Sequence, residues 1–385
     1  MPPQNLRIPG PTPLPDAVRD AGSRQMVGHR GPEFQELVVR VSEGMRPAFG
    51  TQNEVLILTA SGTGGLESAI VSFLSPGDAV LSISIGNFGE RFAKIARAYG
   101  ASVRMLEFEW GQAADPETVR EAVRDMIAQG TGPKAVLVTF NETSTGITNP
   151  LAELAAAIRA EAPDTLILVD GVSAVGAIPL QMDEWDLDVV VTGSQKAWMI
   201  PPGLAMVAAG DRAWAANESA TMPRFYFDLA KHRDVLPSGQ TPWTPAVGIF
   251  FQLEAALELM AAEGWEAIYR RHAACGAASR AGLAAMGFEL YADQAFASDT
   301  VTSALVPEAL AWSAFNKELH GRGLVLAGGQ GKMKGKIFRI GHLGDVRVDD
   351  IVSALEVIEQ GASAVGLAVE TGVGPAAARE AARGV

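Results

Sequence analysis

The chain has 385 residues, 48% of them hydrophobic, so it is long enough to bury a large core and to form two domains of unequal size. Its 31 basic and 44 acidic residues give a net charge of -13, which would repel a nucleic-acid backbone or an anionic bilayer and argues against both as partners. The single cysteine, Cys275, excludes an intrachain disulfide and a cysteine-rich metal cluster. The five histidines lack metal-site spacing, so no metal is expected.

From about residue 55 to 210, short β-branched runs alternate with amphipathic segments of helical periodicity. This alternation predicts an α/β fold in which helices cover both faces of a mainly parallel sheet. Seven strands are expected, at residues 55–61, 79–84, 103–108, 135–140, 165–170, 188–193 and 204–210. Ligands of such sheets bind at the carboxyl ends of the strands.

The two ends of the chain are expected to be organised differently. The Pro-rich arm, residues 1–15, has too little periodicity for an element of its own, and a large domain is expected over residues 16–250. A long helical stretch, two short strands and a final helix predict a smaller α+β domain over residues 251–385, with a fraying tail after residue 370. The N-terminus lacks the apolar stretch of a signal peptide, and no run of about 18 apolar residues occurs, so we expect a cytoplasmic protein.

The first predicted strand runs into a glycine-rich segment, ASGTGGLESA, that opens a helix. Ser61, Gly62 and Thr63 would present unpaired N–H groups and the positive end of the helix dipole, which suits a phosphate. An ordinary strand-to-helix turn with Ser61 or Thr63 as the cap explains the same pattern.

Two further strand ends are polar or glycine-rich. In IGNFGERF, after the second strand, Phe88 could stack on a flat ligand or could be a core aromatic. In FNETSTGITNP, after the fourth strand, Thr143 and Ser144 could donate hydrogen bonds into a site or could cap a turn. Each feature alone leaves both interpretations open.

Lys196 follows one buried β-branched run, and Asp170 ends the preceding one. A lysine and an aspartate at neighbouring strand ends can hold the two ends of pyridoxal phosphate: the amine forms a Schiff base with the aldehyde, and the carboxylate keeps the pyridine nitrogen protonated. A surface lysine and a helix-capping aspartate are the alternative for such a pair alone. Four polar or glycine-rich strand ends along one sheet edge favour the cofactor site.

Motifs along nearly the whole chain resemble one family. They run from IPGPTPLP and GHRGPEF through SGTGGLESA, GNFGERF, NETSTGITNP, VDGVSAVGAIP, TGSQKAW and QTPWTPAV to KGKIFRIGHLGD. In order and spacing they resemble the class V (fold type I) pyridoxal phosphate aminotransferases. The resemblance is to the alanine-glyoxylate, serine-glyoxylate and serine-pyruvate group, with its archaeal aspartate aminotransferase-like members. It implies fold type I, pyridoxal phosphate as cofactor and a homodimer with shared active sites.

The resemblance also assigns roles around the cofactor ring. Lys196 looks like the Schiff-base lysine and Asp170 like the partner of the pyridine nitrogen. Val172 would pack on the ring face opposite Phe88, and Thr143 would bond the ring hydroxyl. Many relatives have tryptophan where this chain has Phe88, so we expect weaker cofactor affinity rather than lost activity.

Further roles concern the phosphate and the substrate. The resemblance implies a phosphate cup made by Ser61, Gly62, Thr63 and Gln195, with Thr241 supplied by the other subunit. Some relatives carry an aromatic hydroxyl that reaches the phosphate at the position of Ser238, where serine is shorter. Arg339 resembles the arginine that grips the substrate carboxylate in a two-pronged pair.

The expected reaction is transfer of an amino group from alanine or serine to glyoxylate or pyruvate, with ping-pong kinetics. Small substrates are favoured because no motif places a second arginine for a side-chain carboxylate, although Arg30 and Arg224 are candidates for that role.

Other fold type I reactions remain open, because aspartate, ureidoglycine and phosphonate transaminases and lyases share the lysine, the aspartate and the phosphate seat. A cysteine desulfurase is disfavoured, since Cys275 lies in an Ala-rich helical stretch and Gln195 replaces the histidine usual before the lysine. A non-catalytic binding protein of the same fold is the alternative from another class. A nucleotide-binding enzyme is disfavoured by the absence of the GxGxxG and GxxxxGK[ST] motifs.

Overall fold

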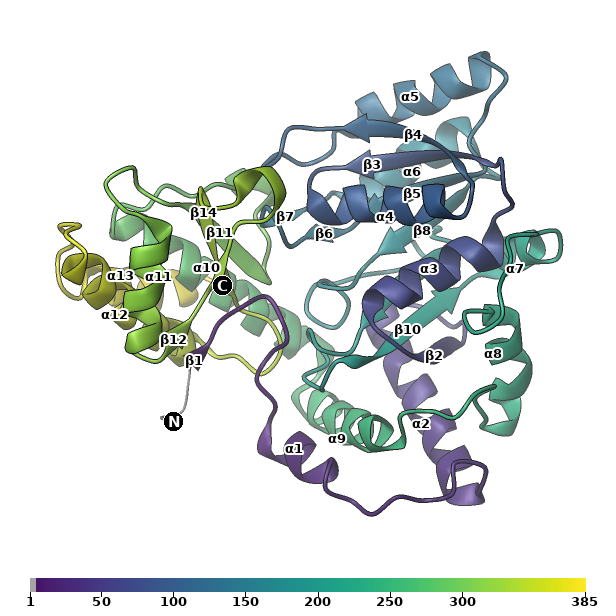
Figure 1. Ribbon diagram of the computed structural model, residues 1–385, viewed down its shortest axis with the longest axis horizontal. Coiled ribbons are helices and arrows are strands. Elements are labelled where there is room, and N and C mark those ends of the chain that lie inside the picture. Colours follow the sequence, from purple (N-terminus) through teal and green to yellow (C-terminus); the bar gives the residue numbers. More distant parts are fainter. Residues whose placement is uncertain (1–4) are drawn as a thin grey trace.

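The computed structural model describes residues 5–385, and the first four residues of the predicted arm lie outside this range. Figure 1 shows a larger lobe built around one sheet and a smaller lobe formed by the C-terminal part of the chain. Within the described residues, no helix is long and apolar enough to cross a membrane.

The sheet of the larger lobe has the seven strands that the sequence predicts. They are β2 (Val55–Ala60), β3 (Ala79–Ser84), β4 (Ser102–Glu107), β5 (Ala135–Thr139), β8 (Leu166–Asp170), β9 (Val189–Gly193) and β10 (Gly203–Ala209). Their order is β2-β10-β9-β8-β5-β3-β4, and only β10 runs antiparallel to its neighbours. The predicted α/β fold with a mainly parallel sheet is confirmed.

Helices cover both faces of this sheet, and alternate side chains of each strand enter two separate cores. Val190 packs with the core beneath α2, α5, α6 and α9, whereas Val191 packs with the core beneath α3, α4, α7 and α8. In Figure 1, α3 and α4 lie in front of the sheet and α6 lies behind it. The helices are α1 (Asp16–Ala21), α2 (Pro32–Phe49), α3 (Gly62–Phe73), α4 (Asn87–Ala98), α5 (Pro116–Ala128), α6 (Leu151–Glu161), α7 (Asp211–Asn217), α8 (Leu229–Val235) and α9 (Val247–Glu263). Burial on both faces explains the apolar runs of the central strands.

The smaller lobe packs a third core between a three-stranded antiparallel sheet and four helices. The sheet has the order β11 (Val301–Leu305), β14 (Ile337–Gly341) and β13 (Ala327–Gly328). The helices are α10 (Trp265–Ala285), α11 (Trp312–Gly321), α12 (Val348–Ala364) and α13 (Val373–Ala382). The predicted boundary after residue 250 falls inside α9, so the division at that residue stays a prediction.

Two expectations about the chain ends are wrong. In the arm, β1 (Asn5–Leu6) pairs in parallel with β12 (Leu324–Val325), far away in the sequence. The tail after residue 370 forms α13, which packs against α10 and α12 and buries Ala378. Contacts with segments far away in the sequence stabilise both ends of the chain. Such contacts do not produce a periodic pattern in the local sequence. The long helical stretch is divided by Gly264, whose φ of 85° ends α9 before α10 begins.

Candidate active site

A cavity of about 250 Å³ lies at the carboxyl ends of β2, β5, β8 and β9. It brings together most of the site residues that the sequence predicts. They are Ser61, Gly62, Thr63, Phe88, Thr143, Asp170, Val172, Gln195 and Lys196. Because all of them lie at or just after the carboxyl ends of strands, the fold alone gathers them at one edge of the sheet.

Lys196 and Asp170 are both buried beside this cavity. Burial lowers the pKa of Lys196 to about 8, helped by the nearby charge of Arg339 and opposed by Asp170. Burial raises the pKa of Asp170 to about 6, although the N–H of Val172 donates to its Oδ1 (3.0 Å) and favours the ionised form. Burial therefore disfavours the charged form of both the lysine and the carboxylate at this cavity.

The N-terminal arm passes directly over the lysine. Lys196 Nζ donates a hydrogen bond to the carbonyl of Pro9, and Thr12 Oγ1 donates to the carbonyl of Lys196 (3.1 Å). A Cβ atom on Gly10 would lie 2.8 Å from Lys196 Cδ, so no side chain fits there. Apart from the proline-rich motif itself, nothing in the sequence indicates these contacts.

The first turn of α3 forms one wall of the cavity. Ser61 occupies the N-cap position without a side-chain cap bond, so the N–H groups of this turn have no partner within the helix. A Cβ on Gly62 would lie 2.7 Å from Val172 Cγ2, which shows how closely the turn approaches the end of β8. Gln195 also lines the cavity, and its Oε1 is buried without a hydrogen-bond partner among residues 5–385. The unpartnered N–H groups of the turn form a seat for an anion.

Thr143 and Ser144 have different surroundings. Thr143 lines the cavity, and its Oγ1 donates to Ser173 Oγ (2.8 Å), which in turn donates to the carbonyl of Asn141 (2.9 Å). Ser144 does not line the cavity, because its Oγ donates to Glu142 Oε1 (2.5 Å) instead. Of the two hydroxyls that could serve a ligand, only that of Thr143 faces the site.

Arg339 lies in β14, at the meeting of the two lobes. Its Nε and Nη2 donate to the carbonyl of Gly328 (3.0 and 2.8 Å), and its Nη1 donates to the carbonyl of Thr143 (2.9 Å). Burial lowers the pKa of Arg339 to about 10, opposed by the charge of Glu142. The arginine does not itself line the cavity, but it contacts the backbone of a residue that does.

Ser238 and Thr241 lie away from this cavity in the single chain. Ser238 is exposed, and its Oγ donates to the carbonyl of Val235 (2.7 Å). Thr241 is buried, and its Oγ1 donates to the carbonyl of Trp243 (2.7 Å). Both residues are expected to contact the cofactor of a partner subunit. The structure of a single chain does not test that contact.

Neither of the two candidate second arginines reaches the cavity. Arg30 donates from Nη1 to the carbonyl of Thr241 (2.6 Å). Arg224 donates from Nη1 to the carbonyl of Val71 (3.0 Å), and its Nε lies 3.5 Å from Asp228 Oδ1. A different arginine, Arg91, lines the cavity instead, with its guanidinium carbon 4.6 Å from the centre of the Phe88 ring.

Sequence reasoning missed four polar residues that line the cavity, Arg91, Asn141, Ser173 and Gln330. Arg91, Asn141 and Ser173 belong to the quoted motifs GNFGERF, NETSTGITNP and VDGVSAVGAIP. The signal was therefore available for these three, but a motif does not say which of its side chains turn inward. Gln330 comes from the smaller lobe, and only the fold brings it to the cavity.

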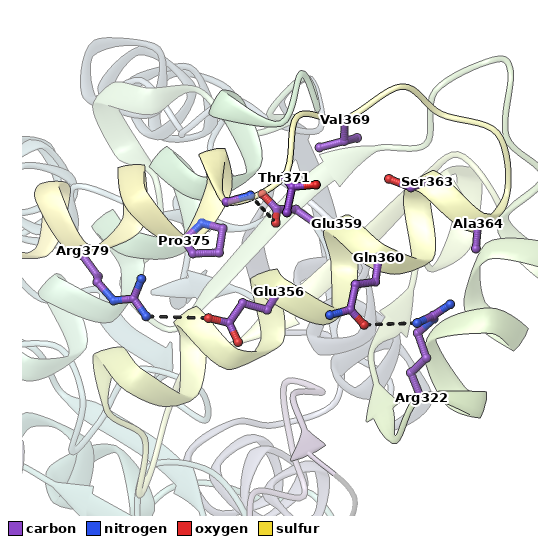
Figure 2. A pocket seen from close by; sticks show the side chains of 11 residues that line it. Arg322, Glu356, Glu359, Gln360, Ser363, Ala364, Val369, Thr371, Pro375 and Arg379 are labelled. Carbon is purple, nitrogen blue, oxygen red and sulfur yellow. Dashed lines mark hydrogen bonds and ion pairs between the residues drawn. The ribbon is translucent and has the colours of Figure 1, made fainter.

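A larger cavity of about 800 Å³ lies in the smaller lobe, between α12 and the start of α13 (Figure 2). Its charged side chains already have partners. Glu359 accepts from the N–H groups of Gly372 and Gly374 (both 3.0 Å), and Arg379 lies 3.7 Å from Glu356. It holds no lysine beside a buried carboxylate, so the chemistry belongs to the smaller cavity.

The model of the aminotransferase class-V family matches residues 10–340. The chain belongs to this family. Among known proteins, this aminotransferase is 44% identical over 355 residues to the small subunit of a soluble hydrogenase of Synechococcus sp. (strain PCC 6716), covering 92% of this chain and 91% of the relative. It is 36% identical over 382 residues to the serine–glyoxylate aminotransferase of Methylorubrum extorquens, covering 97% and 94%. The crystal structure of the ureidoglycine-glyoxylate aminotransferase of Bacillus subtilis matches with a TM-score of 0.92 at 29% identity, covering 100% and 99%.

These matches establish the pyridoxal phosphate-dependent transferase fold type I and imply that cofactor for the aminotransferase. The residues of the cavity fit it. The uncapped first turn of α3 leaves N–H donors free for the phosphate, while Lys196 and Asp170 offer an amine for the aldehyde and an anion for the pyridine nitrogen.

Proposed function

We propose that this aminotransferase binds pyridoxal phosphate in the 250 Å³ cavity and transfers an amino group from alanine or serine to glyoxylate or pyruvate by a ping-pong mechanism. The observation that carries the proposal is the burial of Lys196 and Asp170 beside one cavity that also contains the first turn of α3. The Methylorubrum and Bacillus relatives, both named for glyoxylate, support the acceptor.

Seven residues would surround the cofactor. Ser61, Gly62, Thr63 and Gln195 would surround the phosphate at the positive end of α3. Phe88 and Val172 would pack against the ring. Thr143 would bond the ring hydroxyl, and its present partner, Ser173, fixes the Oγ1 position. When bound, pyridoxal phosphate supplies an electron sink that makes the substrate α-carbon acidic.

The remaining chemistry belongs to side chains of this protein. Asp170 would keep a proton on the pyridine nitrogen through a charge-assisted hydrogen bond. The amine of Lys196, with its pKa lowered to about 8, would take a proton from the substrate α-carbon and return it to the former aldehyde carbon of the cofactor. Arg339 would bind the substrate carboxylate in exchange for its bonds to the carbonyls of Gly328 and Thr143, and would so fix the α-carbon near that amine. Since the first product leaves before the second substrate binds, the kinetics are ping-pong.

Aspartate is a second candidate donor, because Arg91 lines the cavity and supplies a cation in addition to Arg339. A side-chain carboxylate that paired with Arg91 would make acidic amino acids acceptable, whereas alanine and serine need no such partner. The choice between the donors therefore depends on Arg91 rather than on Arg30 or Arg224.

The Synechococcus relative is named as a hydrogenase subunit, and we do not propose a hydrogenase activity for this chain. A redox site such as an iron–sulfur cluster would need several thiolates as ligands. This chain has only Cys275, which is buried in the third core, and burial raises the pKa of its thiol to about 12.

The test is the visible absorption spectrum of the cofactor-loaded protein before and after separate additions of alanine, serine and aspartate, without a keto acid. The expected result is that alanine or serine shifts the band of lysine-bound cofactor to shorter wavelength. If aspartate alone does so, and Arg91→Met abolishes the shift, the donor is acidic. A loaded protein that no amino acid changes contradicts transamination, and a protein that gains no band at all contradicts the role of Lys196.

We further propose a cytoplasmic homodimer with shared active sites. Phe225 and Tyr226 are 68% and 41% exposed, and both stack with Trp243, two residues from Thr241. An exposed aromatic cluster of this kind suits an interface, and a second copy there would bring Thr241 toward its neighbour's phosphate. Light scattering of the loaded protein is expected to give a dimer, and dilution to monomer is expected to release cofactor. A fully loaded monomer would contradict the sharing of sites.

A further inference from the structure

One buried carboxylate beside the active site has no role in the chemistry described above. Glu142 lies in the short strand β6 (Asn141–Glu142) and is completely buried. Its Oε2 accepts hydrogen bonds from the N–H groups of Phe88 (3.0 Å) and Gly89 (3.1 Å). Both N–H groups belong to the first turn of α4, where helices lack internal partners for their donors.

The other oxygen of Glu142 extends this contact to a third residue. Glu142 Oε1 accepts from the N–H (3.0 Å) and the Oγ (2.5 Å) of Ser144, and that Oγ accepts from the N–H of Asn87 (3.0 Å). Three successive N–H groups of α4 are thus bound, directly or through one hydroxyl, by a carboxylate that lies far away in the sequence.

The fit around the carboxylate is tight. A Cβ on Gly86, the N-cap of α4, would lie 2.5 Å from Glu142 Cδ and 2.6 Å from Ser144 Oγ. A local Ser or Asp cap at residue 86 would satisfy the same donors without burying a second carboxylate near Asp170. The arrangement is therefore more costly than helix capping requires, and the residue it holds, Phe88, carries a ring that lines the cavity.

We infer that Glu142 is a positioning residue: it fixes the first turn of α4 so that the Phe88 ring lies against the bound cofactor. This inference rests on the proposed binding of pyridoxal phosphate in the cavity. Charge-assisted hydrogen bonds to a carboxylate are strong and directional, so the backbone of Phe88 is held in place before the cofactor arrives.

The experiment titrates cofactor-free protein with pyridoxal phosphate and follows the visible absorbance and circular dichroism of the bound ring. Glu142→Gln keeps the shape but replaces an acceptor oxygen with an amide donor that faces N–H groups. We expect its Kd for the cofactor to rise about tenfold, with a weaker dichroic band because the ring is held less firmly.

Glu359→Gln is the matched control. Glu359 is also buried and also accepts from two N–H groups at a helix start, those of Gly372 and Gly374 at α13, in the smaller lobe. It should lower thermal stability while leaving the cofactor Kd unchanged. If both variants lose stability and neither changes Kd or dichroism, Glu142 is only a helix cap and the inference is overturned.

A double-mutant cycle tests whether Glu142 acts through the ring. Phe88→Ala should weaken cofactor binding by itself, and adding Glu142→Gln should then have little further effect. Effects that multiply would show that Glu142 does not act through Phe88 and would overturn the inference. If Glu142→Gln does not fold, Ser144→Ala decides in its place: we expect about a threefold rise in Kd, and an unchanged Kd contradicts the inference. A wild-type protein that binds no pyridoxal phosphate would instead contradict the proposed function.

Discussion

Gly10 lies where the N-terminal arm crosses Lys196. Its replacement by alanine should lower the free energy of unfolding and displace the Lys196 side chain. Its φ of 103° is unfavourable for an L-residue and costs about 1–3 kcal/mol. The added Cβ would also lie 2.8 Å from Lys196 Cδ and 3.0 Å from the carbonyl oxygen of Gln195. Overpacking of this kind costs about 1–3 kcal/mol, so the total is roughly 2–6 kcal/mol.

Gly77→Ala separates the two costs, since Gly77 has a similar φ of 89° but nothing within 4 Å of its Cβ position. Urea unfolding of the cofactor-free proteins should show a loss of about 1–3 kcal/mol for Gly77→Ala and a clearly larger loss for Gly10→Ala. Only Gly10→Ala should load pyridoxal phosphate more slowly, by about tenfold or more, because only it displaces Lys196. Equal stability losses and equal loading rates in the two variants would refute the packing of the arm against the lysine.

Three further predictions concern buried charges. Asp170→Asn should retain the cofactor but lower turnover by roughly 10²–10³-fold, because the pyridinium loses its anion, and near-normal steady-state kinetics would contradict this role. The rate of cofactor loading should rise with pH through about 8, the lowered pKa of Lys196, since only the neutral amine attacks the aldehyde; stopped-flow rates that rise only near 10.5 would count against it. Asp188→Asn should reduce the unfolding free energy by about 3–5 kcal/mol, because Asp188 is 1% exposed and pairs with Arg159 (2.5 Å) and Arg212; chemical denaturation showing a loss below about 1 kcal/mol would oppose this.

The sheet was predictable because its strands are buried on both faces, which makes runs such as LILVD and VVVTG apolar up to their last one or two residues. The residues at the ends of these runs were predictable for the same reason. Once Asp170 ends one strand and Lys196 follows the next, parallel pairing of β8 and β9 leaves both at one edge.

Residues held by distant backbone could not be predicted in this way. The contact of Pro9 with Lys196 depends on the pairing of the arm with β12. The acceptor is a backbone carbonyl, and the residue type does not show which carbonyl will accept the bond. The same holds for Glu142, whose partners are N–H groups that every residue possesses. Its neighbour Ser144 looked like a ligand-binding hydroxyl, yet it serves that carboxylate, because the sequence does not show which way a side chain turns.

The lysine that makes the site reactive should also make the cofactor-free protein less stable. The pKa of Lys196 is about 8 in the folded protein against 10.5 in the unfolded chain, so its contribution to stability is present above pH 10.5 and is lost as pH falls through 8. At pH 7 the penalty is on the order of 3 kcal/mol. Lys196→Met removes that buried charge, and after the loss of the hydrogen bond to Pro9 we expect a net gain of about 1–2 kcal/mol at pH 7.

This gain should shrink to nothing near pH 10, where the wild-type amine is neutral in the folded protein, and urea unfolding at the two pH values measures it. A variant that is less stable than wild type at pH 7 would show that the amine is well solvated or well paired. The lowered pKa, and with it the readiness of Lys196 to act as a base near neutral pH, would then need another origin than burial.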